Sequence, residues 1–156
     1  MHGLHARLPR NFVLEERLER YADAIELEPA RLAGRWVDAC TPIGCAPFRE
    51  VRLDVGCGKG AFLTASAAAE PDVLFIGLDG EPVCIVYSAQ HIIEEGLGNA
   101  LVIPGLGDDL VASAGALPAL SPVMEIFFAG RSMVLSSRAL RASLGGMGMN
   151  SPCSKK

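Results

Sequence analysis

The sequence predicts an α/β protein with a parallel sheet, and three observations carry this prediction. Short apolar runs alternate with helix-compatible segments between residues 51 and 128, which is the pattern of repeated β-α-β units. Three glycines at alternate positions follow the first apolar run: Gly56, Gly58 and Gly60. The second apolar run ends at Asp79, and parallel sheets gather their ligand-binding residues at the carboxyl ends of their strands.

The composition limits the class of protein. The chain has 156 residues, of which 50% are hydrophobic and 21% charged, so we expect one globular domain with its own core. It has no run of 18 apolar residues and no apolar segment near its N-terminus, so we expect neither a membrane span nor a secretory signal. Its five cysteines form no CxxC pair or His/Cys cluster. We therefore expect a cytoplasmic protein with reduced thiols and no metal site.

Residues 1–50 are expected to form an N-terminal arm and helices ahead of the core. The first 11 residues are basic and contain a proline, which is typical of an arm. Phe12–Leu27 has an approximate apolar stripe and predicts a helix, with Asn11 as its cap and Pro29 beyond its end. Trp36 is the only tryptophan, and we expect it to have a packing role.

Residues 51–130 are expected to form the core, and residues 131–156 an atypical tail. The predicted strands are Val51–Val55, Val73–Asp79, Ala100–Ile103 and Val123–Phe128. The predicted helices are Ala61–Ala69, Glu81–Glu95 and Asp108–Ala116. Pro82 lies in the first turn of its helix, where a proline is tolerated. The Ser, Gly and Met content of residues 145–152 is typical of a loose tail.

The glycine-rich loop could serve three kinds of ligand. A nucleoside triphosphate loop needs GxxxxGK followed by Ser or Thr, which the chain lacks. A dinucleotide fingerprint needs G-x-G-x-x-G, and here Gly60 comes one residue too early. The pattern acidic-x-G-x-G-x-G of S-adenosylmethionine loops fits Asp54 to Gly60 without a gap. An acidic residue before the loop disfavours a pyrophosphate and favours the amino group or sulfonium of that cofactor.

Asp79 adds a second carboxylate to this prediction. At the end of the second strand, a carboxylate can accept hydrogen bonds from both ribose hydroxyls of an adenosine. NAD would use the same residue, and the alternative interpretation is an aspartate that caps the next helix. Cys57 has no partner His or Asn nearby in sequence, so we interpret it as a small loop residue and not as a nucleophile. Residues 51–110 carry 9 acidic and 2 basic residues, which suits a cofactor bearing positive charge.

Several segments resemble the bacterial tRNA (guanine-N7-)-methyltransferases. They are Leu53–Leu63 with the glycine loop, Pro71–Asp79, the Gly-Leu-x-Asn turn at Glu95–Asn99, Gly34-Arg-Trp36 and the basic arm Arg7–Arg10. The resemblance covers about residues 4 to 110. It implies a Rossmann-like class I methyltransferase sheet with helices on both faces. It also implies that the protein transfers a methyl group from S-adenosylmethionine to a guanine in tRNA.

The resemblance also implies site residues. Those expected to contact the cofactor are Asp54, Gly56, Cys57, Gly58, Asp79, Gly80 and Asp108. Asp108 fits the family's pattern least well, because Leu106 occupies the position at which the family has an acidic residue near the adenine. The residues expected to meet RNA phosphates are Arg7, Arg10 and Arg17. Ordinary solvated surface is the alternative for these arginines.

The chain departs from the family after the fourth predicted strand. The family has an Asp-Pro-Trp motif there, followed by a basic run that engages tRNA, whereas this chain has Ile126-Phe-Phe-Ala-Gly-Arg131. We therefore expect the sheet to be incomplete beyond the fourth strand, which would lie beside the first and expose an apolar edge. A truncated or frame-shifted reading frame would produce such a tail. Two alternatives remain: an inactive cofactor-binding remnant of the family, and an NAD-binding Rossmann enzyme.

Overall fold

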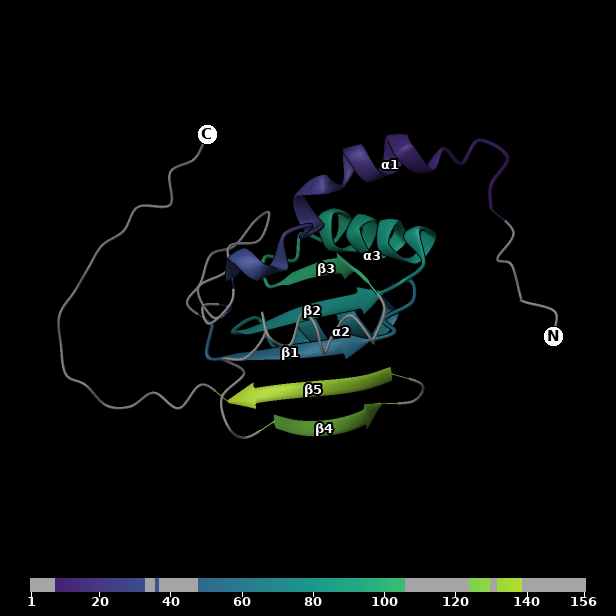
Figure 1. Ribbon diagram of the computed structural model, residues 1–156. Coiled ribbons are helices and arrows are strands. Elements are labelled where there is room, and N and C mark those ends of the chain that lie inside the picture. Colours follow the sequence, from purple (N-terminus) through teal and green to yellow (C-terminus); the bar gives the residue numbers. More distant parts are fainter. Residues whose placement is uncertain (1–7, 33–35, 37–47, 106–123, 130–131, 139–156) are drawn as a thin grey trace, which may run out of the picture.

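The computed structural model describes residues 8–32, 36, 48–105, 124–129 and 132–138, and within them it is an α/β protein (Figure 1). A five-stranded sheet has the order β3-β2-β1-β5-β4. The first three strands are parallel: β1 (Glu50–Val55), β2 (Val73–Asp79) and β3 (Ala100–Pro104). The α/β class predicted from the alternating pattern is confirmed.

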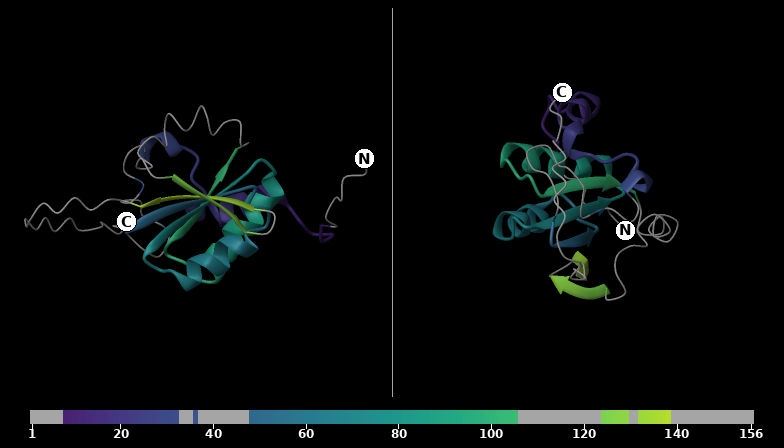
Figure 2. Two further views of the ribbon diagram at one scale, coloured as in Figure 1. Left: turned by 90° about the horizontal axis from the view of Figure 1, so that it is seen from below. Right: turned by 90° about the vertical axis from the view of Figure 1, so that its left-hand side faces the viewer.

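The two long helices pack together on one face of the parallel strands. They are α2 (Ala61–Ala69) and α3 (Pro82–Glu94), and Figure 2 shows both on the same side of the sheet. Between them and the sheet lies a buried cluster that includes Leu63, Phe75, Ile85 and Val102. These residues recur at helical spacing on the helices and at alternate positions on the strands, so each element contributes its apolar face.

The opposite face of the sheet is covered by chain that precedes β1. Trp36 and Phe48 are buried there against Leu53, Ile76 and neighbouring strand residues. The packing role expected for Trp36 is therefore confirmed. Burial on both faces explains why β2 is apolar at nearly every position, because a central parallel strand has no face toward water.

The N-terminal helix is shorter than the sequence predicts. The structure has α1 over Leu14–Arg20 and a 3-10 turn over Ala22–Ala24, where the sequence predicted one helix over Phe12–Leu27. The predicted cap at Asn11 is also wrong, because Val13 precedes the first helical residue and no side chain caps the helix.

The helix ends early because the following segment extends along the sheet. Ile25 forms a parallel bridge with Val102 of β3, and the Glu26 backbone N–H donates to the Val102 carbonyl at 2.8 Å. These contacts require extended backbone, which a helix cannot supply. The segment therefore covers part of the outer edge of β3.

The fourth strand does not lie beside the first as predicted. Strand β4 (Met124–Ala129) forms the edge of the sheet, and β5 (Ser132–Arg138) lies between β4 and β1, antiparallel to both. Ala129 of β4 lies opposite Ser132 of β5, and it is β5 that pairs with β1. The helix predicted over Asp108–Ala116 lies outside the described residues.

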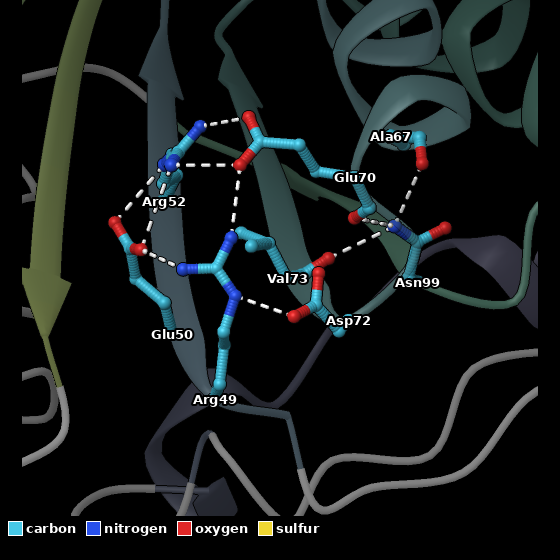
Figure 3. A network of polar contacts seen from close by, with 8 residues as sticks. All are labelled: Arg49, Glu50, Arg52, Ala67, Glu70, Asp72, Val73 and Asn99. Atoms are coloured by element: carbon cyan, nitrogen blue, oxygen red, sulfur yellow. Dashed lines mark hydrogen bonds and ion pairs between the residues drawn. The ribbon is translucent and has the colours of Figure 1, made fainter.

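The amino end of the parallel sheet is held by a polar network, drawn in Figure 3. The Asn99 side-chain amide donates to the carbonyls of Ala67, Glu70 and Val73, at 2.9, 3.0 and 2.9 Å. It thereby joins the end of α2 to the start of β2. The Gly-Leu-x-Asn turn, noted above for its resemblance to the family, thus has a structural explanation in this chain.

Charged residues complete the network beside Asn99. Glu50 is only 3% exposed and pairs with Arg49 and Arg52. Both arginines also reach Glu70 on the loop after α2, and Arg49 reaches Asp72. A buried carboxylate is tolerated only when it is paired in this way.

Candidate functional site

The residues predicted to contact the cofactor lie at the carboxyl edge of the parallel strands, apart from Asp108, which is outside the described residues. Asp54 is the penultimate residue of β1, and Asp79 is the last residue of β2. Residue pairing in parallel register brings the ends of the two strands together, with Val55 opposite Leu78. The Gly56 and Cys57 backbone N–H groups both donate to the Leu78 carbonyl, at 2.8 and 3.1 Å. The glycine loop therefore begins as a direct extension of β1 and lies over the end of β2.

The three loop glycines all need the left-handed backbone region. Their φ angles are +75° at Gly56, +56° at Gly58 and +80° at Gly60, and among the described residues no other residue type has a positive φ. The surroundings of the three differ. A Cβ at Gly56 or Gly58 would have no atom within 4 Å, whereas one at Gly60 would lie 2.8 Å from the Ser88 Oγ. The first two glycines leave open space beside the loop, and the third lets α2 approach α3.

Asp79 links the loop to the helix that follows it. Its Oδ2 accepts from the Gly58 N–H and its Oδ1 from the Glu81 N–H, both at 2.9 Å. Glu81 is itself the N-cap of α3 and no side chain caps that helix, so the bond from Asp79 closes a turn before α3 and is not the helix cap of the alternative interpretation. A carboxylate has about four acceptor positions, so two backbone bonds leave capacity for ligand hydroxyls. Asp79 is half-buried and Gly80 beside it is exposed, so this capacity faces accessible space.

Asp54 and Cys57 lie deeper in the site. Asp54 is only 2% exposed. The pKa of the Cys57 thiol is raised to about 12, mainly by burial and to a lesser degree by the negative charges of Asp54 and Asp79. The thiol therefore stays protonated near neutral pH and is a poor nucleophile, in agreement with its interpretation as a loop residue. Its sulfur also explains Gly77, because a Cβ there would lie 2.9 Å from the Cys57 Sγ.

Two α3 residues that the sequence analysis did not single out support the loop from behind. The Ser88 hydroxyl donates to the Gly58 carbonyl at 2.9 Å, and the His91 Nδ1 lies 3.1 Å from the Lys59 carbonyl. The sequence shows only that a serine stands among apolar residues of this helix; that its hydroxyl is buried and needs a partner becomes visible in the structure.

The three arginines expected to bind RNA differ in their exposure and in their contacts. Arg10 is exposed, whereas Arg7 lies outside the described residues, as does the cofactor candidate Asp108. Arg17 is half-buried and donates to the Gln90 Oε1 at 2.7 Å. Its guanidinium also lies over two rings, 4.9 Å from the centre of Phe12 and 5.8 Å from that of Tyr87. Arg17 therefore joins α1 to α3, and a role toward RNA stays a prediction.

The residues at this edge fit S-adenosylmethionine better than a phosphate-rich cofactor. The loop is flanked by two carboxylates, Asp54 and Asp79, which would attract an ammonium or sulfonium and repel a pyrophosphate. The loop also carries one cation, Lys59, whose Nζ lies 4.7 Å from the centre of the Tyr87 ring, so two carboxylates stand against one ammonium. Open space beside Gly56 and Gly58 would allow a ligand to approach the backbone closely.

Two classes of feature are absent from the described residues. No group of three His, Cys, Asp or Glu side chains is arranged to hold a metal ion in that part of the chain. No helix in the same part is long and apolar enough to cross a membrane.

Comparison with known proteins points to methyltransferases. A family model with the description "Putative methyltransferase" matches residues 49–116, which include β1, the glycine loop, β2 and β3. A tRNA (guanine-N(7)-)-methyltransferase of Geobacillus kaustophilus is 29% identical over 98 residues, covering 63% of this chain and 43% of the relative. One from Limosilactobacillus fermentum is 29% identical over 93 residues, covering 60% and 41%. One from Lactococcus lactis subsp. cremoris is 32% identical over 84 residues, covering 54% and 36%.

These matches confirm the resemblance that the sequence motifs indicated. The chain spans less than half the length of the curated relatives that it matches. The residues matched by the family model contain the glycine loop and both carboxylates.

Proposed function

We propose that this chain binds S-adenosylmethionine and acts in methyl transfer to a guanine of tRNA, as the names of its relatives indicate for them. The observation that carries the proposal is the edge formed by Asp54, the glycine loop and Asp79, inside the region that the methyltransferase family matches. Such a reaction belongs in the cytoplasm, where tRNA is found and thiols stay reduced.

Each site residue has a defined part in this proposal. Asp54 would hold the positively charged amino acid end of the cofactor, and Asp79 would accept hydrogen bonds from its ribose hydroxyls. Gly56 and Gly58 would give the ligand close access to the backbone, with Cys57 and Gly80 as neighbours. When bound, the cofactor supplies a methyl group activated by its sulfonium. Because guanine N7 is a neutral lone pair, the protein's contribution would be mainly to orient two substrates.

The RNA-binding part of the proposal rests on cations outside the acidic core. Residues 51–110 carry a net charge of −7, so phosphates would dock on the flanking parts. Arg7, Arg10 and Arg17 are our candidates for these contacts, and Asp108 remains our candidate for a contact near the adenine. Binding through phosphates would weaken steeply as salt concentration rises.

Calorimetric titration of the purified chain with S-adenosylmethionine tests the cofactor. We expect binding by the native chain and loss of binding in Asp54→Asn. The matched control is Asp72→Asn, which changes an exposed carboxylate at the opposite end of the sheet and should leave the affinity unaltered. Preferential binding of NAD would contradict the proposal and favour the dinucleotide alternative.

A methyl-transfer assay with unmodified tRNA tests the activity. Transfer to guanine N7 is the expected result. Binding of the cofactor without transfer would favour the second candidate, a cofactor-binding remnant. The sequence observation that favours this candidate is the Ile126–Arg131 segment, which has no Asp-Pro-Trp motif where the family has one.

A further inference from the structure

Three consecutive peptide groups of the glycine loop are each held by a side chain from beyond the loop. The N–H of the Cys57–Gly58 peptide donates to Asp79. The carbonyl of the Gly58–Lys59 peptide accepts from Ser88, and the carbonyl of the Lys59–Gly60 peptide is in contact with the His91 ring. Backbone bonds tie Gly56 and Cys57 to Leu78 and Gly60 to Cys57, and the three side-chain contacts add support at the peptide groups between Cys57 and Gly60.

Two of the three contacts come from one side of α3. Ser88 and His91 are three residues apart, and helical residues at that spacing lie on the same face. Ser88 is wholly buried and lies so close to Gly60 that only glycine fits there. His91 must carry its proton on Nδ1 in this contact, because the Lys59 carbonyl can only accept. Tyr87, one residue before Ser88, has the Lys59 ammonium over its ring.

We infer that Ser88 and His91 are positioning residues, which hold the Gly58–Gly60 backbone from α3 in the shape that receives the cofactor. The inference rests on the proposed function for its ligand, but the loop contacts stand without it. A loop that is already ordered loses less conformational freedom when a ligand binds, so these contacts would raise affinity without touching the ligand.

Variants of His91 give the sharper test, because this side chain is partly exposed and its loss should leave the fold intact. His91→Ala should weaken S-adenosylmethionine binding by about 2- to 12-fold, the range equivalent to one hydrogen bond. His91→Asn should restore the affinity, because the Asn amide N–H can take the place of Nδ1–H. Gln90→Ala is the matched control: Gln90 contacts Arg17 and Glu94 and should leave the affinity unchanged.

Ser88→Ala should weaken binding over the same range. Since Ser88 is wholly buried, Ile92→Val is its control, because it removes a buried methyl group from the core side of the same helix. Both variants should lower stability, and only Ser88→Ala should lower affinity. Equal affinities in the native chain, His91→Ala and Ser88→Ala would overturn the inference.

Amide hydrogen exchange tests whether α3 holds the loop without any ligand being present. In the cofactor-free protein, the Gly58 N–H donates to Asp79 and the Gly60 N–H to the Cys57 carbonyl. We expect His91→Ala to speed exchange at both amides by about 2- to 12-fold and Gln90→Ala to leave them unchanged. If the native chain did not bind S-adenosylmethionine, the proposed function would fail, and the exchange rates would still decide whether α3 holds the loop. Unchanged exchange in His91→Ala would refute it.

Discussion

The loop glycines offer a matched pair of substitutions that separates backbone strain from packing. Gly56→Ala and Gly60→Ala both place a Cβ on backbone with φ near +75° to +80°. An L-residue in this region costs about 1–2 kcal/mol. At Gly56 nothing lies within 4 Å of the new methyl group, so strain is the whole cost.

At Gly60 the new methyl group would also collide with α3. It would lie 2.8 Å from the Ser88 Oγ and 3.1 Å from the Ser88 Cα. Because the Cα belongs to a packed helix, relief requires α2 and α3 to separate, and such overpacking costs about 1–3 kcal/mol. We therefore expect destabilisation by about 1–2 kcal/mol for Gly56→Ala and about 2–5 kcal/mol for Gly60→Ala.

Urea denaturation of the two variants measures the difference, provided that both keep the m-value of the native chain. The Gly56→Ala protein, which remains folded, should lose affinity for S-adenosylmethionine because its methyl group enters the open space beside the loop. A Gly60→Ala variant no less stable than Gly56→Ala would show that α2 and α3 are not packed through Ser88, and our account of the third glycine would be refuted.

Three further predictions concern single residues. Asn99→Ala should lower the free energy of unfolding by about 2–4 kcal/mol, because three carbonyls share its amide; urea denaturation measures this, and cofactor affinity should not change. Asp79→Asn keeps one acceptor and should lower the free energy of unfolding by about 1 kcal/mol, whereas Asp79→Ala loses both backbone bonds and should lower it by about 2 kcal/mol. Equal losses for the two variants in thermal unfolding would argue against two hydrogen bonds to Asp79. The third concerns Cys57, whose pKa is raised in the folded state, so its thiol loses a proton at lower pH in the unfolded chain. Its contribution to stability should be complete below about pH 8.5 and fall toward pH 12 by at most about 1.4 kcal/mol per pH unit, and Cys57→Ala should remove this component of the pH dependence of unfolding.

The parallel core was predictable because its local and tertiary preferences agree. Ala61–Ala69 has the predicted bounds, and β2 has the predicted length, since glycine, proline and apolar periodicity mark their ends. The same agreement applies to the site, where Asp54 and Asp79 follow buried strands and must meet at one edge of a parallel sheet.

The parts that sequence reasoning missed depend on contacts between distant segments. Nothing local shows that Ile25 extends along β3, so the apolar stripe of α1 predicted too long a helix. Strand β5 occupies the place beside β1 that the fourth predicted strand was expected to take, and only pairing energies across the whole sheet decide between the two. Ser88 and His91 acquire their role from the loop about 30 residues earlier, which periodicity within a helix cannot reveal.

The bridge between Ile25 and Val102 has a consequence for how this protein can be divided. The region matched by the methyltransferase family begins at residue 49, but a fragment cut there would lack the segment that covers β3. It would also leave both core clusters open, because Tyr21 belongs to one and Trp36 to the other. We therefore expect the matched region to be unstable as a separate fragment, because residues before it cover the edge of β3 and complete both core clusters.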